Sequence, residues 1–248
     1  MSVDQELDHY PPVSDATKTR VRQIRDYCDV GINLFWQRQL IFVAAIGLSA
    51  YYYHIWLSMV TLILITISEV YDYILFRQVA AWRGRSERVM KHFMIRLYCG
   101  TFLSASVISF YSISIALEQG PSTHFMSLFF LFAAALFAAM NNHQLLTVLS
   151  LRLVIYGTTF LFIPVFDIVR TGAGLESELW MQFFTVLFVL YFIVDCSRIY
   201  LNLYRANRRQ LEELRVEHEK TKVAYVAKTE FISTISHELR TPLTSIKG

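Results

Sequence analysis

Six apolar segments follow one another along the middle of the chain, separated by short polar stretches. A helix needs roughly 20 residues to cross the hydrocarbon core of a membrane, which is about 30 Å thick. Unpaired peptide groups are costly in lipid and the strict alternation of a membrane barrel is absent, so we expect helices. The first two segments are joined closely around His54 and are predicted to form a helical hairpin. The predicted spans, which together make up a sensory domain over 38–198, are residues 38–53, 55–76, 94–117, 124–141, 144–168 and 178–198.

The N-terminal segment, residues 1–37, is polar and lacks the apolar run of a cleavable signal peptide, so we expect it to stay in the cytoplasm. Within it, Val21, Ile24 and Cys28 recur at helical spacing among basic residues. This pattern is typical of an amphipathic helix on the inner membrane surface. It is equally typical of a solvated helix that leads into the first span, and both interpretations are open at this point.

Residues 199–228 are dense in charge, free of Gly and Pro, and rich in helix-forming residues. The last membrane helix is therefore predicted to continue without a break into a linker helix. Apolar residues on this linker form an irregular heptad-like stripe, which favours a dimeric coiled coil over a solvated single helix. The stripe consists of Leu201, Tyr204, Leu211, Leu214 and Val223.

The last segment, residues 229–248, has apolar residues at helical spacings of three and four, which place them on one face of a predicted helix. His237 lies two residues from both Ile235 and Leu239, about 200° around the helix, so we expect it to point away from that face. An exposed imidazole can act as a nucleophile near neutral pH. Glu238 can orient a proton of the ring, and Thr241 lies one turn further along. The apolar face consists of Ile232, Ile235, Leu239, Leu243 and Ile246.

The run from Phe231 to Leu243, with the string SHELRTPL at its centre, resembles the H box of two-component sensor histidine kinases of the HisKA class. The resemblance implies that His237 is the phosphoacceptor and that Glu238 assists autophosphorylation. It implies that Thr241 positions water for dephosphorylation of a response regulator. It further implies a homodimer in which residues 229–248 begin the dimerisation and phosphoacceptor hairpin.

Members of that family bind ATP and Mg²⁺ in a separate α/β domain with Asn-bearing and Gly-rich boxes. Neither GxGxxG nor GxxxxGK[ST], the sequences that cradle phosphate groups, occurs in this chain. Phosphoryl transfer depends on positioning and on neutralisation of charge by metal ions and donors, so a nucleophile without its ATP site has little catalytic power. We therefore expect the chain to be the front part of a kinase and to be inactive alone.

The composition agrees with an all-α membrane protein. Of the 248 residues, 54% are hydrophobic and 17% are charged, whereas about 25% are charged in typical soluble domains. This balance excludes intrinsic disorder and a secreted disulfide scaffold. Cys28, Cys99 and Cys196 lie too far apart in sequence to suggest a metal cluster or a disulfide framework. Neither a resident metal nor a nucleic acid partner is expected.

Lysine and arginine residues are distributed unevenly among the connections between the spans. The segments around His54 and over residues 118–123 have none. The positive-inside rule therefore predicts six spans with both termini in the cytoplasm, as in a multi-pass protein of the bacterial inner membrane. Because the outer loops are short, we expect the stimulus to be a small ligand or a change in the membrane lipids. The basic residues between the second and third spans are Arg77, Arg83, Arg85, Arg88, Lys91 and Arg96.

Polar and ionisable residues inside spans are costly and are therefore candidates for function. A group of them is predicted to share one depth toward the cytoplasmic side. One interpretation is a pocket for a ligand or an ion. The other, which we favour, is a structural ion pair between Arg152 and Glu69, because a buried arginine needs a partner whether or not a ligand binds. This predicted polar band consists of Glu69, Asp72, Asn141, Asn142, His143, Arg152 and Asp195.

Other polar residues lie near the predicted outer ends of the spans. Glu118 and Asp167 are expected to be solvated boundary residues. His54 and His124 could bind a metal ion, but the sequence places no carboxylate at a matching spacing, and no metal site is predicted.

A six-span transporter or channel with a basic cytoplasmic tail is the alternative function. The H-box string favours the sensor kinase. The spans also lack the paired Gly/Pro-broken segments, in two matching halves, that mark the inverted repeats of many transporters.

Overall fold

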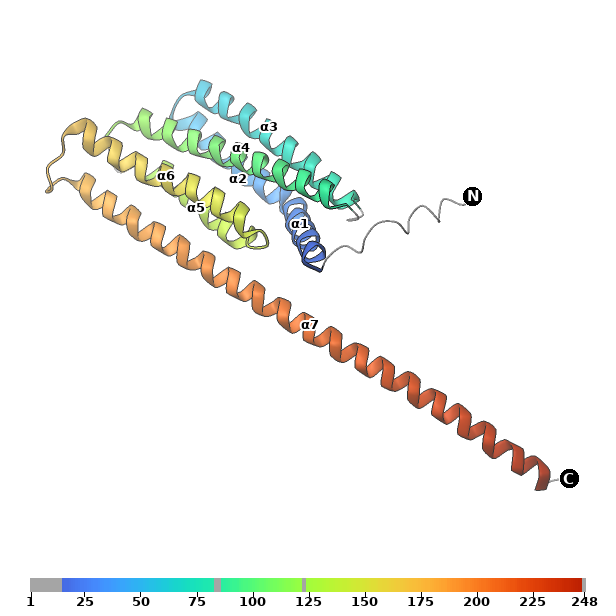
Figure 1. The fold of residues 1–248 in the computed structure, drawn as a ribbon. Coiled ribbons are helices and arrows are strands. Elements are labelled where there is room, and N and C mark those ends of the chain that lie inside the picture. The colour runs from blue at the N-terminus through green and yellow to red at the C-terminus, as the bar shows by residue number, and fades with distance from the viewer. Residues whose placement is uncertain (1–14, 83–85, 122–123, 247–248) are drawn as a thin grey trace. The chain divides into compact units, whose positions relative to one another are not determined.

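A computed structural model of the chain describes residues 15–82, 86–121 and 124–246, and all regular secondary structure in these ranges is helical. This confirms the expected all-α class for the described residues. A helix covers each of the six apolar segments. The helices are α1 (Asp15–Asn33), α2 (Phe35–Tyr52), α3 (Ile55–Ala81), α4 (Glu87–Gln119), α5 (Phe125–Asn141), α6 (Leu146–Thr171) and α7 (Glu178–Ile246) (Figure 1).

Four of these helices, α3, α4, α6 and α7, are long and apolar enough to cross a membrane. Helix α2 reaches that length only together with α1, from which it is bent by 52°. Helix α5 is apolar but has 17 residues. The apolar helices indicate a membrane protein, whereas the count of six crossings stays a prediction.

Helix α1 packs onto the other helices through its apolar face. Val21, Ile24 and Cys28 are buried in one cluster with Leu75 and Phe76 of α3. Protein therefore covers this apolar face, whereas the position of α1 relative to a membrane surface stays a prediction. The physical reason is that α3 runs to Ala81, beyond the predicted end of its span, and so offers a further turn of apolar surface.

The predicted hairpin around His54 is confirmed. Helix α2 ends at Tyr52, α3 begins at Ile55, and the two helices pack against each other. The hydroxyl groups of Ser49 and Ser58 lie 2.6 Å apart between them.

Helix α4 is the central element of the bundle, because it packs against α3, α5 and α6 (Figure 1). Small residues allow close packing on the α5 side, where Ala105 of α4 shares a buried cluster with Leu131 and Ala135. Near one end of the bundle, the Tyr111 hydroxyl of α4 donates a hydrogen bond of 2.8 Å to the Ala45 carbonyl of α2.

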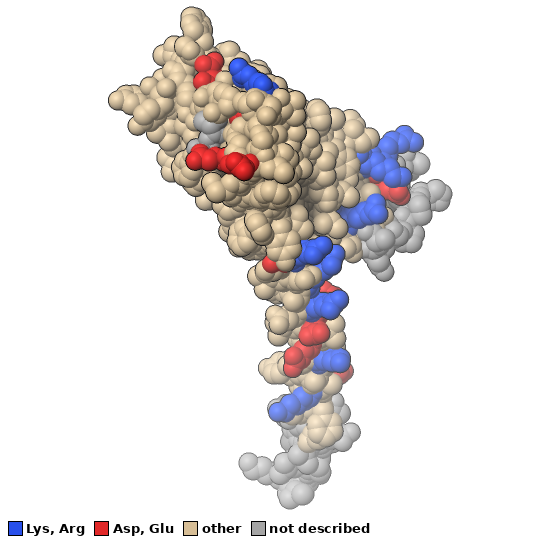
Figure 2. All heavy atoms as spheres, turned by 90° about the vertical axis from the view of Figure 1, so that its left-hand side faces the viewer, with Lys and Arg blue, Asp and Glu red and all other residues tan. Residues whose placement is uncertain are grey.

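The chain divides into two units, residues 1–201 and 202–248. Helix α7 has 69 residues and belongs to both, which confirms that the helix of the last apolar segment continues without a break. In the second unit the described side chains are mostly exposed. Lysine, arginine, aspartate and glutamate side chains are interspersed along this part of α7, whereas the face of the helix bundle seen in Figure 2 is almost free of charge between its two ends.

Candidate functional site

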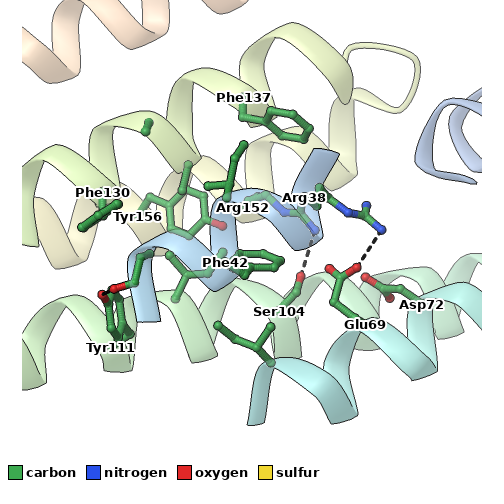
Figure 3. Close-up of a pocket in the computed structure, with 16 residues that line it drawn as sticks. Arg38, Phe42, Glu69, Asp72, Ser104, Tyr111, Phe130, Phe137, Arg152 and Tyr156 are labelled. Atoms are coloured by element: carbon green, nitrogen blue, oxygen red, sulfur yellow. Dashed lines mark hydrogen bonds and ion pairs between the residues drawn. The ribbon is translucent and has the colours of Figure 1, made fainter. Parts of the chain in front are cut away.

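Helices α2 to α6 enclose a cavity of about 130 Å³ (Figure 3). Each helix contributes side chains from a single face; on α5, for example, Phe130, Ala133, Ala134 and Phe137 recur at spacings of three, one and three. Most of the wall is aliphatic or aromatic. The polar lining residues are Arg38, Glu69, Asp72, Ser104, Tyr111, Arg152 and Tyr156.

Glu69 is paired with two donors from α2. The Arg38 Nη2 atom lies 3.0 Å from Glu69 Oε2, and Gln39 Nε2 donates to the same oxygen at 2.9 Å. The Arg38 and Glu69 side chains are 15% and 8% exposed. The expected ion pair between Arg152 and Glu69 is therefore wrong. Helix α2 begins at Phe35 and packs against α3, so Arg38 in the first turn of α2 lies within reach of Glu69. Arg38 therefore occupies the position beside Glu69 that was expected for Arg152 of α6.

Arg152 is held by a hydroxyl group. Its Nη2 atom donates to Ser104 Oγ at 2.9 Å, and Ser104 in turn donates to the Thr101 carbonyl at 3.2 Å. Its Nε atom is buried without a hydrogen-bond partner. Within the described ranges, no carboxylate oxygen lies within 4.0 Å of the Arg152 guanidinium. The charge of Arg152 is thus compensated only at longer range, by Asp72 and Glu69.

The Asp72 carboxylate lies beside Glu69, one turn further along α3 (Figure 3). Asp72 is 5% exposed and, in the described part of the chain, accepts no hydrogen bond. It packs against Gly100 of α4, where an added methyl group would overlap the carboxylate. Glycine at this position therefore lets α3 and α4 approach closely.

The remaining members of the predicted polar band are dispersed. Asn141 and Asn142 line a smaller cavity of about 10 Å³ next to Arg152. His143, between α5 and α6, donates from Nδ1 to the Met140 carbonyl at 2.7 Å, and burial lowers the pKa of its imidazole. Asp195 of α7 is half-buried and lines neither cavity. The structure therefore brings Glu69, Asp72 and Arg152 to one cavity and does not bring His143 or Asp195 there.

A second polar contact lies near one end of the bundle, between α5 and α6. His124 donates from Nε2 to the Asp167 carboxylate, and its Nδ1 atom lies 3.2 Å from Gln119 Oε1. Asp167 is 3% exposed, so the expectation of a solvated boundary residue is wrong. The reason is that His124, in a left-handed conformation with φ 44°, folds over the end of α6. His54 and Glu118 form a more exposed contact of 3.6 Å.

A search of the described residues finds no cluster of three or more metal-binding side chains. Four polar residues that line the cavity were not predicted from the sequence: Arg38, Ser104, Tyr111 and Tyr156. Arg38 had a usable signal, because a long basic side chain at the start of a span can reach a carboxylate on the neighbouring helix. Ser104, Tyr111 and Tyr156 had no such signal in the sequence, since hydroxyl residues are common where membrane helices pack together.

The H-box residues His237, Glu238 and Thr241 lie on the helical backbone of α7, and their side chains are outside the described residues. Ile232 and Ile235, whose side chains are described, are 53% and 38% exposed. Residues 202–246 form a single helix, and the sequence contains no glycine-rich phosphate-binding motif of the kinds named above. Binding of ATP and Mg²⁺ therefore stays a prediction for the complete kinase.

Comparison with known proteins gives one family match. Residues 227–248 match the family of the His Kinase A (phospho-acceptor) domain. The chain matches no curated protein and no solved structure. The resemblance of the SHELRTPL string is thus confirmed: residues 227–248 are similar to the His Kinase A phosphoacceptor domain, which is consistent with a fragment of a histidine kinase.

Proposed function

We propose that the chain is the membrane-embedded sensory part of a two-component sensor histidine kinase. The observation that carries this proposal is the phosphoacceptor match at residues 227–248, on the same continuous helix as the last apolar segment. A continuous helix that carries both the last apolar segment and the phosphoacceptor match can transmit a small displacement from one to the other.

His237 is proposed as the nucleophile that accepts the phosphoryl group and passes it to an aspartate of a response regulator. Glu238 assists the first transfer by orienting a proton of the imidazole ring. Thr241 positions the water that hydrolyses the phosphorylated regulator. ATP and Mg²⁺ would be bound by a domain outside residues 1–248.

The proposed topology has six crossings of the bacterial inner membrane, with both termini in the cytoplasm. The 17 residues of α5 span about 26 Å at 1.5 Å per residue, close to the thickness of the hydrocarbon core. Basic side chains gather at one end of the bundle and few lie at the other, which supports a cytoplasmic connection between α3 and α4 (Figure 2).

A homodimer is proposed through the cytoplasmic part of α7. Leu211 and Leu214 are 48% and 61% exposed, and Ile232 and Ile235 lie three heptads further along the helix. A heptad repeat keeps these four side chains on one stripe, where a second copy of the helix would cover them.

The test joins residues 1–248 in frame to the second hairpin helix and ATP-binding domain of a sensor histidine kinase and measures labelling by γ-phosphate-labelled ATP. His237→Gln should abolish acid-labile labelling and leave membrane insertion intact, and Thr241→Ala should mainly slow the phosphatase reaction. His218→Gln, on the same helix outside the H box, is the matched control and should label normally. Persistent acid-labile labelling of the His237→Gln protein would refute the assignment.

A further inference from the structure

The cavity enclosed by α2 to α6 has the size of a small ring. An apolar protein cavity of about 150 Å³ is known to hold benzene, and a water molecule takes up about 30 Å³. The volume here is about 130 Å³, and most of the wall is formed by side chains such as Phe42, Ile65 and Phe130. Apolar walls of this kind favour the apolar body of a ligand over a cluster of water molecules.

Two polar groups at the cavity have hydrogen-bonding capacity left over. Arg152 uses its Nη2 atom on Ser104, and its Nε atom is buried without a hydrogen-bond partner in the described part of the chain. The Asp72 carboxylate accepts no hydrogen bond from any described residue. Buried polar groups are normally satisfied, so an unused donor and an unused acceptor on one cavity call for a molecule between them.

The charged side chains that line the cavity determine whether a ligand there should be charged or uncharged. Arg38 and Arg152 balance Glu69 and Asp72, and Glu69 is already paired with Arg38. A charged ligand would leave an uncompensated charge in a poorly solvated site, which is strongly unfavourable. An uncharged ligand that accepts from Arg152 and donates to Asp72 avoids this penalty.

We propose that this cavity binds a small uncharged amphipathic molecule with a carbonyl oxygen next to an N–H or O–H donor. The carbonyl oxygen accepts from Arg152, the donor faces Asp72, and the apolar body lies among the side chains of α2 and α5. Its role as the sensory input rests on the proposed function, whereas the binding itself does not.

The test measures saturable binding of four matched probes to the purified chain in lipid nanodiscs by calorimetry. Benzamide is uncharged and carries both polar functions, benzoate is an anion, benzylammonium is a cation, and toluene is apolar. We expect benzamide to bind at least tenfold more tightly than each of the other three. Tightest binding of benzoate would overturn the proposal in favour of an anion site at Arg152. Absence of saturable benzamide binding would also refute the proposal and would favour a cavity filled with water.

Variants locate the binding. Ala133→Leu adds three carbons at the cavity wall and should weaken benzamide binding at least tenfold, whereas Ala44→Leu, at an exposed position of α2, should leave it unchanged. Asp72→Asn should weaken binding of benzamide more than binding of toluene. Thermal unfolding of each variant identifies those that fail to fold, and the two leucine variants keep the test decisive if Asp72→Asn is one of them. Equal binding by both leucine variants would place the site elsewhere and refute the proposal.

The outcome is independent of phosphoryl transfer, because no ATP is present. Benzamide binding without labelling of His237 in the joined protein would preserve the cavity and refute the kinase proposal. Labelling of His237 without benzamide binding would support the kinase proposal and refute the cavity proposal.

Discussion

Arg38 in the first turn of α2 is joined to Glu69 in α3 by an ion pair of 3.0 Å, with both side chains largely buried. The pair connects two helices that are neighbours along the chain. Arg152 of α6, which has no part in this pair, donates a hydrogen bond to Ser104 instead. A guanidinium and a carboxylate in a poorly solvated bundle are stabilising only together, because either alone is an uncompensated charge.

Removing one partner of this pair should therefore destabilise the bundle. We expect Arg38→Gln or Glu69→Gln to lower the free energy of unfolding by about 3 to 5 kcal/mol, and the double variant to lose less than the sum of the single losses. Denaturant unfolding of the detergent-solubilised chain measures all three. The exposed pair of Glu87 and Lys91, 2.9 Å apart, is the control, and its disruption should leave the free energy of unfolding nearly unchanged, because solvent screens both charges. Additive losses at Arg38 and Glu69 would contradict the pairing.

The contact between His124 and Asp167 gives a second prediction. Asp167→Ala should lower the free energy of unfolding by about 1 to 3 kcal/mol, because it removes the carboxylate that accepts from the buried Nε2 atom of His124. Glu176→Ala, at an exposed position in the connection between α6 and α7, should change it by less than about 0.5 kcal/mol. Thermal unfolding distinguishes the two variants. Equal stability of both would show that Asp167 is solvated after all.

Glycine substitutions test the close approach of α3 and α4. Gly100→Ala would place a methyl group against Asp72 and the Tyr71 ring, and we expect a loss of about 1 to 3 kcal/mol. Gly47→Ala is the matched control, since nothing lies within 4 Å of the added carbon; alanine there should stabilise α2 by up to about 1 kcal/mol. Both are measured as changes in the free energy of unfolding. Changes of the same sign and size would rule out the close approach.

The proposed topology predicts the location of reporters fused within the chain. A periplasm-active reporter placed after Gln119, at the end of α4, should be active, and one placed after Arg88, at its start, should be inactive. A cytoplasm-active reporter should give the opposite pattern. Periplasmic activity after Arg88 would invert or refute the six-span arrangement.

Cysteine crosslinking tests the proposed dimer. In a chain with Cys28, Cys99 and Cys196 replaced by alanine, Leu214→Cys should form a disulfide between two copies under mild oxidation, because the stripe faces its symmetry partner. Glu213→Cys, one residue away and off the stripe, should crosslink much less. Non-reducing electrophoresis gives the yield. Comparable yields at both positions would indicate random collision of monomeric helices.

The sequence by itself determined the helical class and the position of the phosphoacceptor match. Long apolar runs leave few alternatives to helices, because backbone groups in lipid must be paired within the segment. The order of residue types around His237 was equally local information, and the continuous α7 follows from a segment without Gly or Pro.

Only the tertiary structure decided which polar residues meet. Glu69, Asp72 and Arg152 line one cavity, in agreement with a shared position along their helices. A shared position along the helices leaves rotation about each helix axis and the choice of neighbour open. Those depend on how five helices pack at once, and this packing placed Arg38 on Glu69 and Ser104 on Arg152. The same packing buried Asp167 under His124 and covered α1 with α3. A side chain's partner is a long-range property, because it is set by residues far away in the sequence whose positions no local pattern contains.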